Sequence, residues 1–194
     1  MVPSQAIDRN NLSDLQLVAQ VVAVQNKPAF SELVRRYQSP LRNYLRHLTN
    51  NHATADDLAQ ETFIKTWEKA HTFSGKGSFK AWLYKVAYNQ FLQGLRKIKR
   101  DRITDISEEQ ASVVEFQHAA KLDENAPDLN RFLEVLNPNE RMTMVLAYAH
   151  GMSHAEISEV SGLPVGTIKS HINRGKHKIQ ETFDLKEHTI HKAS

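Results

Sequence analysis

The sequence predicts an all-α protein made of two small helical domains that an acidic, flexible linker joins. Apolar residues recur at steps of three and four along most of the chain, and no segment alternates convincingly with a period of two. Charge locates the domains, because residues 103–130 carry seven acidic side chains against the single positive charge of Lys121. We therefore place one domain at 10–101, the linker at 102–129 and the second domain at 130–185.

The composition is that of a globular protein with a leaning toward polyanionic partners. Of 194 residues, 40% are hydrophobic and 24% are charged, and the net charge of +3 accompanies a pI near 9.1. Cysteine is absent, which excludes disulfides and thiolate metal sites, and we expect neither a metal nor a cofactor. No apolar run is long enough to span a bilayer, so we expect a cytoplasmic protein that does not insert into the membrane.

The first helical patterns of the N-terminal domain begin with a capping signal. Ser13 and Gln16 have the spacing of a capping box, ahead of an apolar stripe that continues to Val22. The next stripe occupies 30–37. Pro40 then removes an N–H that a helix interior needs, so we expect a helix to restart or kink there.

Two further helices complete this domain. Thr54 is the expected N-cap of a helix at about 55–70, with Ala59, Phe63, Trp67 and Ala70 facing inward. Ser78 is the expected N-cap of a long final helix. The inner stripe expected for that helix consists of Phe79, Trp82, Leu83, Val86, Ala87, Phe91 and Ile98.

Residues 152–178 have the pattern of a helix-turn-helix. Ser153 and Glu156 form a capping box, and Gly162 and Pro164 end the first helix. The exposed faces of the second helix are cationic and carry no acidic residue, which is typical of a helix that enters a DNA major groove. Helix pairs around such a turn also occur in proteins that never touch DNA. The candidate DNA contacts are Thr167, Lys169, Ser170, His171, Asn173, Arg174 and Lys176.

A second candidate site is the acidic face formed by Asp57, Gln60 and Glu61, which lie at i, i+3 and i+4 of one helix. Three interpretations stay open: a solvated surface, a carboxylate metal site with His47 or His52 nearby, and a docking face for a basic helical partner. The Glu-x-x-His repeats of a helical di-metal site are absent, which argues against the second interpretation.

A third candidate site begins at the loop 73–78, FSGKGS, and continues along the next helix. The loop lacks a full phosphate-loop motif and follows no strand, so a nucleoside triphosphate site is not expected. Aromatic, amide and cationic side chains are interleaved on the helix, which suits single-stranded nucleic acid. The alternative is that Tyr84 and Tyr88 simply pack in a core. The candidate contacts are Phe73, Ser74, Gly75, Lys76, Lys80, Tyr84, Lys85, Asn89, Arg96 and Lys97.

The order of these parts resembles the extracytoplasmic-function (ECF) sigma factors of RNA polymerase, within the sigma-70 superfamily. The patterns DD-L-x-QE-TF and F-x-x-WL-Y-x-x-A-x-N are specific in combination. The resembling segments are FSELVRRYQSPLRNYLRHL (30–48), DDLAQETFIKTWEKA (56–70), FSGKGSFKAWLYKVAYNQF (73–91), LNPNERMTMVLAYAHGMSHAEIS (136–158) and PVGTIKSHINRGKHKI (164–179).

The resemblance implies a role for each candidate site. The acidic helix, with Asp57, Gln60 and Glu61, matches the region 2 face that docks on the clamp helices of the polymerase β′ subunit. The loop and helix after it match the part that opens the −10 promoter element and traps a flipped base. The helix-turn-helix matches region 4, which reads the −35 element, and the linker matches the segment that threads toward the polymerase active site.

The implied protein is a non-enzymatic specificity subunit that brings RNA polymerase to promoters and starts DNA melting. Its implied partners are core RNA polymerase, through the β′ clamp helices and the β subunit, promoter DNA and an anti-sigma factor. Three residues depart from the family pattern. His171 and Asn173 stand where many members carry a basic residue and a larger side chain, and Gly175 replaces a common alanine at a cost of about 1 kcal/mol in a helix interior.

Two other classes of protein compete with this interpretation. An ordinary helix-turn-helix regulator would use its N-terminal domain to sense a ligand or to dimerise, and it would bind duplex DNA tightly by itself. A helical metal-dependent hydrolase fused to a DNA-binding module would need a clustered ligand set, and the sequence does not supply one.

Overall fold

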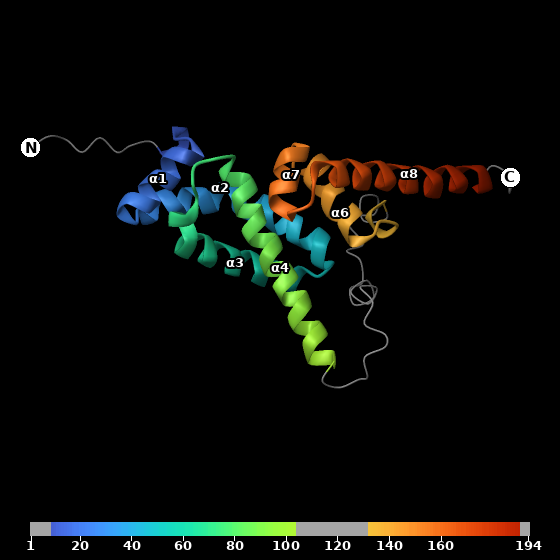
Figure 1. Ribbon diagram of the computed structural model, residues 1–194, viewed down its shortest axis with the longest axis horizontal. Coiled ribbons are helices and arrows are strands. Elements are labelled where there is room, and N and C mark those ends of the chain that lie inside the picture. Colours follow the sequence, from blue (N-terminus) through green and yellow to red (C-terminus); the bar gives the residue numbers. More distant parts are fainter. Residues whose placement is uncertain (1–8, 104–131, 191–194) are drawn as a thin grey trace, which may run out of the picture.

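The computed structural model describes residues 9–103 and 132–190, so nearly all of the expected linker lies outside the described residues. Within those two ranges every regular element is helical, as the sequence predicts, and the helices form two adjoining groups (Figure 1). The first group contains α1 (Asp14–Val24), α2 (Lys27–Thr49), α3 (His52–Lys69), α4 (Phe79–Ile103) and the short 3-10 helices Arg9–Asn11 and Ala70–Thr72. The second contains α6 (Pro138–Met144), the π-helical turn Val145–Ala149, α7 (His154–Ser161) and α8 (Val165–Ile190).

Helix α1 begins at the predicted capping box. The backbone N–H of Gln16 donates to Ser13 Oγ at 3.3 Å, and the backbone N–H of Ser13 donates to Gln16 Oε1 at 2.8 Å. These bonds satisfy two N–H groups that the first turn would leave unpaired. Leu17, Val18 and Val21 then pack into the core.

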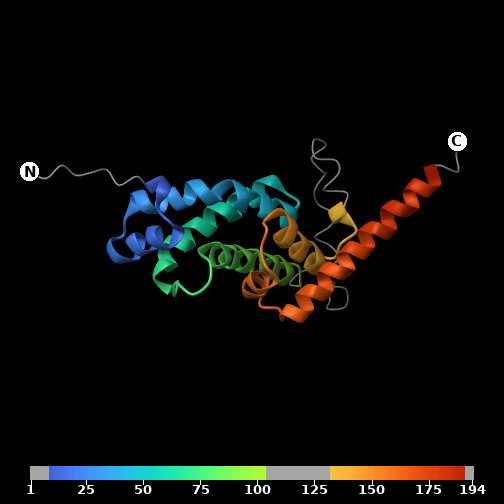
Figure 2. The ribbon, with the colours of Figure 1, turned by 90° about the horizontal axis from the view of Figure 1, so that it is seen from above.

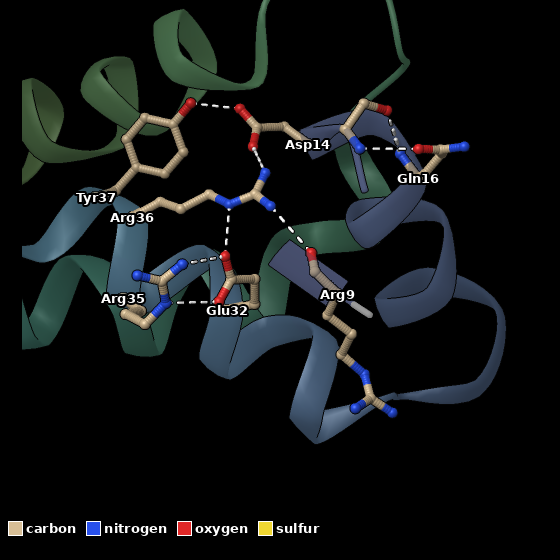
Figure 3. A network of polar contacts seen from close by, with 8 residues as sticks. Arg9, Asp14, Gln16, Glu32, Arg35, Arg36 and Tyr37 are labelled. Carbon is tan, nitrogen blue, oxygen red and sulfur yellow. Dashed lines mark hydrogen bonds and ion pairs between the residues drawn. The ribbon is translucent and has the colours of Figure 1, made fainter. Parts of the chain in front are cut away.

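A polar network fixes α1 to α2 (Figure 3). The buried carboxylate of Glu32 accepts hydrogen bonds from Arg35 Nε at 2.7 Å and Arg36 Nε at 2.8 Å, and these bonds lower the pKa of Glu32 to about 2. Arg36 also reaches Asp14 Oδ1 at 2.9 Å, and the hydroxyl of Tyr37 donates to the other oxygen of Asp14. The charges of this network are paired, as burial requires.

Helix α2 is uninterrupted from Lys27 to Thr49, so of the restart or kink predicted at Pro40 the restart does not occur. Proline removes one intrahelical hydrogen bond, but side chains on both sides of Pro40 anchor the helix in the core. Leu33, Leu41 and Leu45 are each at most 2% exposed. Tertiary packing therefore holds together a helix that local propensity would divide.

Helix α3 begins earlier than predicted, because its N-cap is Asn51 and not Thr54. The backbone N–H of Thr54 donates to Asn51 Oδ1 at 2.9 Å. Its buried row includes two polar residues that the hydrophobic pattern missed. The hydroxyls of Thr62 and Thr66 donate to the carbonyls four residues earlier, at 2.6 and 2.7 Å, so they can be buried without losing a hydrogen bond.

Helix α4 starts where predicted, since Ser78 Oγ accepts the backbone N–H of Ala81 at 3.1 Å. Part of its predicted inner stripe is correct, because Phe79, Leu83, Ala87 and Phe91 are buried. Ile98, in contrast, is 40% exposed, where α4 extends past the other helices (Figure 1).

Close packing of α8 on α6 explains the unusual Gly175. A Cβ atom at this position would lie 3.1 Å from Met144 Cγ and 3.5 Å from Leu136 Cδ2, so the glycine allows the two helices to approach. The closer packing of α8 on α6 therefore offsets part of the helix-propensity cost of Gly175.

The two groups of helices also contact each other. Helix α7 packs against α4, and α6 packs against α2 (Figures 1 and 2). Among the described helices, none has the length and apolar character needed to cross a bilayer.

Candidate nucleic-acid interface

The acidic face of α3 is open to solvent. Asp57, Gln60 and Glu61 are exposed. The neighbouring Asp56 instead faces α2, where its Oδ1 lies 3.6 Å from Arg42 Nε. Ile64, one turn further along the same face, is 59% exposed. The helical spacing of Ile64 from Gln60 and Glu61 places it on this face, although the predicted site contains only polar residues.

The metal-site interpretation of this face gains no support. The described ranges contain no group of three or more histidine, cysteine, aspartate or glutamate residues that could hold an ion. His47 sits instead at the junction of the two domains, where burial and the nearby Arg141 charge lower its pKa.

The candidate residues after the loop 73–78 divide into two sets. One set lies on the outer face of α4, where Lys85, Asn89, Arg96 and Lys97 are exposed. Ser74, Gly75 and Lys76 are exposed in the loop, and Gly75 adopts a φ of 72° that favours glycine. These residues present cations, an amide and free backbone to solvent.

The aromatic side chain beside this outer face is Trp82. It is only partly buried, and its ring lies 5.6 Å from that of Phe73. The hydrophobic pattern predicts Trp82 in the core, but its spacing of three and seven residues from Lys85 and Asn89 puts it on their face. Trp82 therefore adds an aromatic ring to the cations and the amide of this outer face.

The second set turns inward, so of the two interpretations of Tyr84 and Tyr88 the structure supports packing in a core. Tyr84 is completely buried and Tyr88 is 8% exposed, and burial raises the pKa of both hydroxyls. The hydroxyl of Tyr84 lies 3.0 Å from His150 Nδ1, and Lys80 Nζ donates to the backbone carbonyl of His150. These side chains face the C-terminal domain because the two domains pack together, which the periodicity of one helix cannot reveal.

None of the predicted sites includes His150. It follows the π-helical turn, and its backbone N–H donates to the carbonyl of Val145 at 3.2 Å. Burial, with the nearby charges of Lys80 and His47, lowers the pKa of His150 to about 4. His150 is therefore neutral near neutral pH.

The helix-turn-helix forms as predicted. The N–H of Glu156 donates to Ser153 Oγ at 3.3 Å, and Glu156 Oε2 accepts the N–H of Ser153 at 2.9 Å. Gly162 ends α7 with a φ of 73°, and α8 begins at Val165.

The second helix presents only part of the predicted set to solvent. Lys169, Ser170, Asn173, Arg174 and Lys176 are exposed, and Thr167 is half-buried. Lys176 Nζ also lies 5.4 Å from the centre of the exposed Tyr148 ring.

His171 does not lie on the open face, so its predicted exposure is wrong. It is 8% exposed, and its Nδ1 is 2.9 Å from Arg174 Nη2. Arg174 Nε in turn lies 3.9 Å from the carboxylate of Glu140 on α6. Arg174 therefore links α8 to α6, and His171 contacts Arg174 along α8.

Fold and surfaces together define a helical DNA-binding protein with one helix-turn-helix domain and one domain that presents an acidic and a basic helix face. Two family models match the chain, Sigma-70 region 2 over residues 33–101 and Sigma-70 region 4 over residues 128–179. The chain belongs to the sigma-70 family as an ECF sigma factor, which directs core RNA polymerase to promoters and initiates DNA melting. The predicted family is confirmed, and the regulator alternative is not favoured.

Known relatives agree with this assignment. The chain is 30% identical over 181 residues to the RNA polymerase sigma-H factor of Pseudomonas aeruginosa, covering 88% of this chain and 93% of that protein. It is 30% identical over 161 residues to the ECF RNA polymerase sigma factor SigE of Mycolicibacterium smegmatis, covering 79% of this chain and 61% of that protein. The sigma factor RpoE of Bartonella quintana, solved with the anti-sigma factor NepR, superposes with a TM-score of 0.63 at 27% identity, covering 80% of this chain and 96% of that one.

Proposed function

We propose that the exposed residues of α3, α4 and α8 perform the three binding tasks of a sigma factor. The observation that carries the proposal is the outer face of α4, where Lys85, Asn89 and Arg96 are exposed in line with the partly exposed Trp82. Cations follow phosphates and an aromatic ring stacks on an unpaired base, which is the chemistry of single-strand recognition. We assign this face and the loop 73–78 to the non-template strand of the −10 element.

The exposed face of α3 is the proposed docking surface for the β′ clamp helices. Asp57 and Glu61 would meet basic side chains, and Ile64 would supply apolar contact between them. Charge pairs give such an interface its orientation and association rate, while a buried apolar side chain contributes affinity.

The exposed face of α8 is the proposed reader of the −35 element. Lys169, Asn173 and Lys176 lie on one side of the helix at spacings of four and three. An asparagine can form a bidentate pair with adenine, and lysines can contact guanine or phosphate.

The chain acts in this proposal by binding and not by chemical catalysis, in the cytoplasm where polymerase and promoter DNA meet. The free energy for melting comes from polymerase contacts and from capture of unstacked bases. Because the similar RpoE of Bartonella quintana was solved with an anti-sigma factor, we also assign this chain an anti-sigma partner.

Transcription with purified core polymerase and a promoter library tests the proposal. The chain should co-purify with core polymerase and select promoters that share two elements. Asp57→Lys with Glu61→Lys should abolish co-purification while helical circular dichroism stays unchanged. Glu134→Lys with Glu181→Lys, at exposed positions of the other domain, is the charge-matched control and should bind normally. Unchanged core binding in the α3 double variant would falsify the docking assignment.

A further inference from the structure

The contact between the two domains lies where the proposed −10 surface begins. Lys80 and Tyr84, both candidates for DNA contact, are held by His150 of the C-terminal domain. The His150 ring also lies edge-on to the rings of Tyr84 and Tyr44, at centroid distances of 5.1 and 5.8 Å. One histidine thus binds two side chains that the sequence predicts as DNA contacts, next to the loop 73–78.

Acidic side chains of α7 extend this contact to the glycine loop. The hydroxyl of Ser78, which caps α4, donates to Glu156 Oε1 at 2.8 Å. Glu159 Oε2 lies 3.0 Å from the position of a Cβ on Gly77, so it rests against the loop backbone. Carboxylates therefore occupy the positive end of the α4 dipole, beside Lys80, where a nucleic-acid phosphate would also be favoured.

We propose that this contact is an intramolecular lock, in which His150 and α7 compete with −10 promoter DNA for the start of α4 and its loop. The inference rests on the proposed function, because it is that function which assigns the loop 73–78, at the start of α4, to DNA. In the closed chain the outer face of α4 is accessible, but the inner part of the DNA site is covered. Separation of the domains uncovers it.

The polar groups of this contact are incompletely paired, as suits a contact that opens. His150 Nε2 and the hydroxyl of Tyr44 are buried, and neither has a hydrogen-bond partner among the residues that the structure describes. A buried polar atom without a partner loses free energy that water restores once the domains separate. The closed arrangement is therefore less stable than the contact area between the two domains alone would predict.

Protonation of His150 supplies a way to open the lock in a test. Tyr44 and His47 face it from α2, and Lys80 and Tyr84 face it from α4, so within residues 9–103 and 132–190 no carboxylate offsets a positive charge on the ring. Its pKa is about 4 in the closed chain and near the ordinary 6.5 once exposed. Because the closed-state pKa is the lower one, closure is fully favoured above pH 6.5 and weakens as the pH falls.

Glu156 changes this expectation little. Hydrogen bonding to the backbone N–H of Ser153 and to Ser78 lowers the pKa of Glu156. The stability that its carboxylate gives the closed chain is therefore lost only when the pH falls below the ordinary pKa of 4.5. When the pH falls from about 7.5 to about 5.5, the lowered pKa of His150 in the closed chain predicts that the ratio of open to closed chains rises about tenfold.

Distance measurements on the full chain test this prediction without DNA. The chain has no cysteine, so Glu68→Cys and Gln180→Cys place one label on each domain at exposed positions. The labelled chain should show a short distance at neutral pH and a growing population at long distance on acidification. His150→Asn, which cannot titrate, should abolish this response. His177→Asn removes a histidine that is 71% exposed on α8 and should leave it intact. A distance that does not change with pH overturns the lock.

Competition with DNA is tested by His150→Arg, which places a permanent charge beside Lys80. We expect this variant to be open at neutral pH, with unchanged helical circular dichroism. It should bind a pool of short, random-sequence single-stranded DNA several-fold more tightly than the parent chain. An open variant that binds the pool no more tightly overturns the competition, whatever the result of the distance measurement. Failure of the proposed function is separate, because it would appear as normal transcription by variants of the outer α4 face.

Discussion

Lys178 Nζ donates to Glu140 Oε2 at 2.7 Å and so joins the recognition helix α8 to α6. The side chain of Glu140 is only 1% exposed, and its Oε2 also accepts the backbone N–H of Asn137 at 3.0 Å, which completes the capping box of α6. One carboxylate therefore both starts a helix and orients the helix that is assigned to DNA.

We predict that Glu140→Gln lowers the free energy of unfolding by about 1–3 kcal/mol, in the range for a lost hydrogen bond to a charged group. Glutamine keeps an acceptor for the helix cap but leaves Lys178 without its buried counter-charge. Urea denaturation of the full chain measures the effect. Glu181→Gln, at a side chain that is 62% exposed, should stay within about 0.5 kcal/mol of the parent. Equal stability of both variants would contradict the assigned role of Glu140.

The same pair should make the stability pH-dependent. Burial raises the pKa of Glu140, but hydrogen bonds from Lys178 and Asn137, with the charges of Lys178 and Arg174, outweigh burial and lower it. A lowered carboxylate pKa contributes stability above its ordinary value of 4.5, and this contribution is lost as the pH falls below it. The difference between parent and Glu140→Gln should therefore shrink on acidification to about pH 3.5. A difference that grows would reverse the assigned sign.

Two helical glycines offer a matched test of packing against propensity. Gly94→Ala in α4 meets nothing within 4 Å, so it should stabilise the chain by up to about 1 kcal/mol. Gly175→Ala gains the same propensity, but its Cβ must displace Met144, so its net gain should be smaller or negative. Thermal denaturation compares the two. A larger gain at Gly175 would show that the approach of α8 to α6 is not tight.

The elements and surfaces of single helices could be predicted from the sequence, because caps and apolar stripes are local signals. Ser13, Ser153 and Gly162 carry such signals, and all three have the predicted capping roles. The continuity of α2 through Pro40 could not be predicted, because it depends on the packing of residues on both sides.

The exposure of the candidate site residues could likewise be predicted only where it depends on a single helix. Asp57, Lys85 and Lys169 are exposed as expected, since each lies opposite the core of its own helix. Tyr84 and His171 have polar side chains that look suited to a surface, yet both are buried against a partner helix. His150, the polar partner of Tyr84, is brought close only by the fold, whereas Arg174, the partner of His171, lies one turn along the same helix.

On α8, exposed and buried side chains should give different results. Lys169→Ala and Lys176→Ala should each weaken promoter binding by the holoenzyme and reduce the slope of its salt dependence by about 1, as for a phosphate contact. Asn173→Ala should relax preference at one base pair by roughly 1–3 kcal/mol. His171→Ala should lower stability but leave the salt slope unchanged, because its side chain is buried. An unaltered slope and preference in all three exposed-residue variants would exclude α8 as the −35 reader.

The last prediction concerns promoter melting by the outer face of α4. Trp82→Leu combined with Asn89→Ala should leave polymerase recruitment intact but reduce permanganate-reactive thymines in the promoter. Base stacking on an aromatic ring is worth roughly 1–3 kcal/mol, so opening should slow about 5- to 150-fold. A template with a pre-melted bubble should restore most activity, because the strands need no longer be separated. Tyr84→Phe is the matched control, since it alters a buried ring that faces His150, and it should melt duplex promoters normally. If the α4 double variant were equally defective on duplex and bubble templates, lost folding or docking would explain the defect better than a lost contact with the unpaired strand.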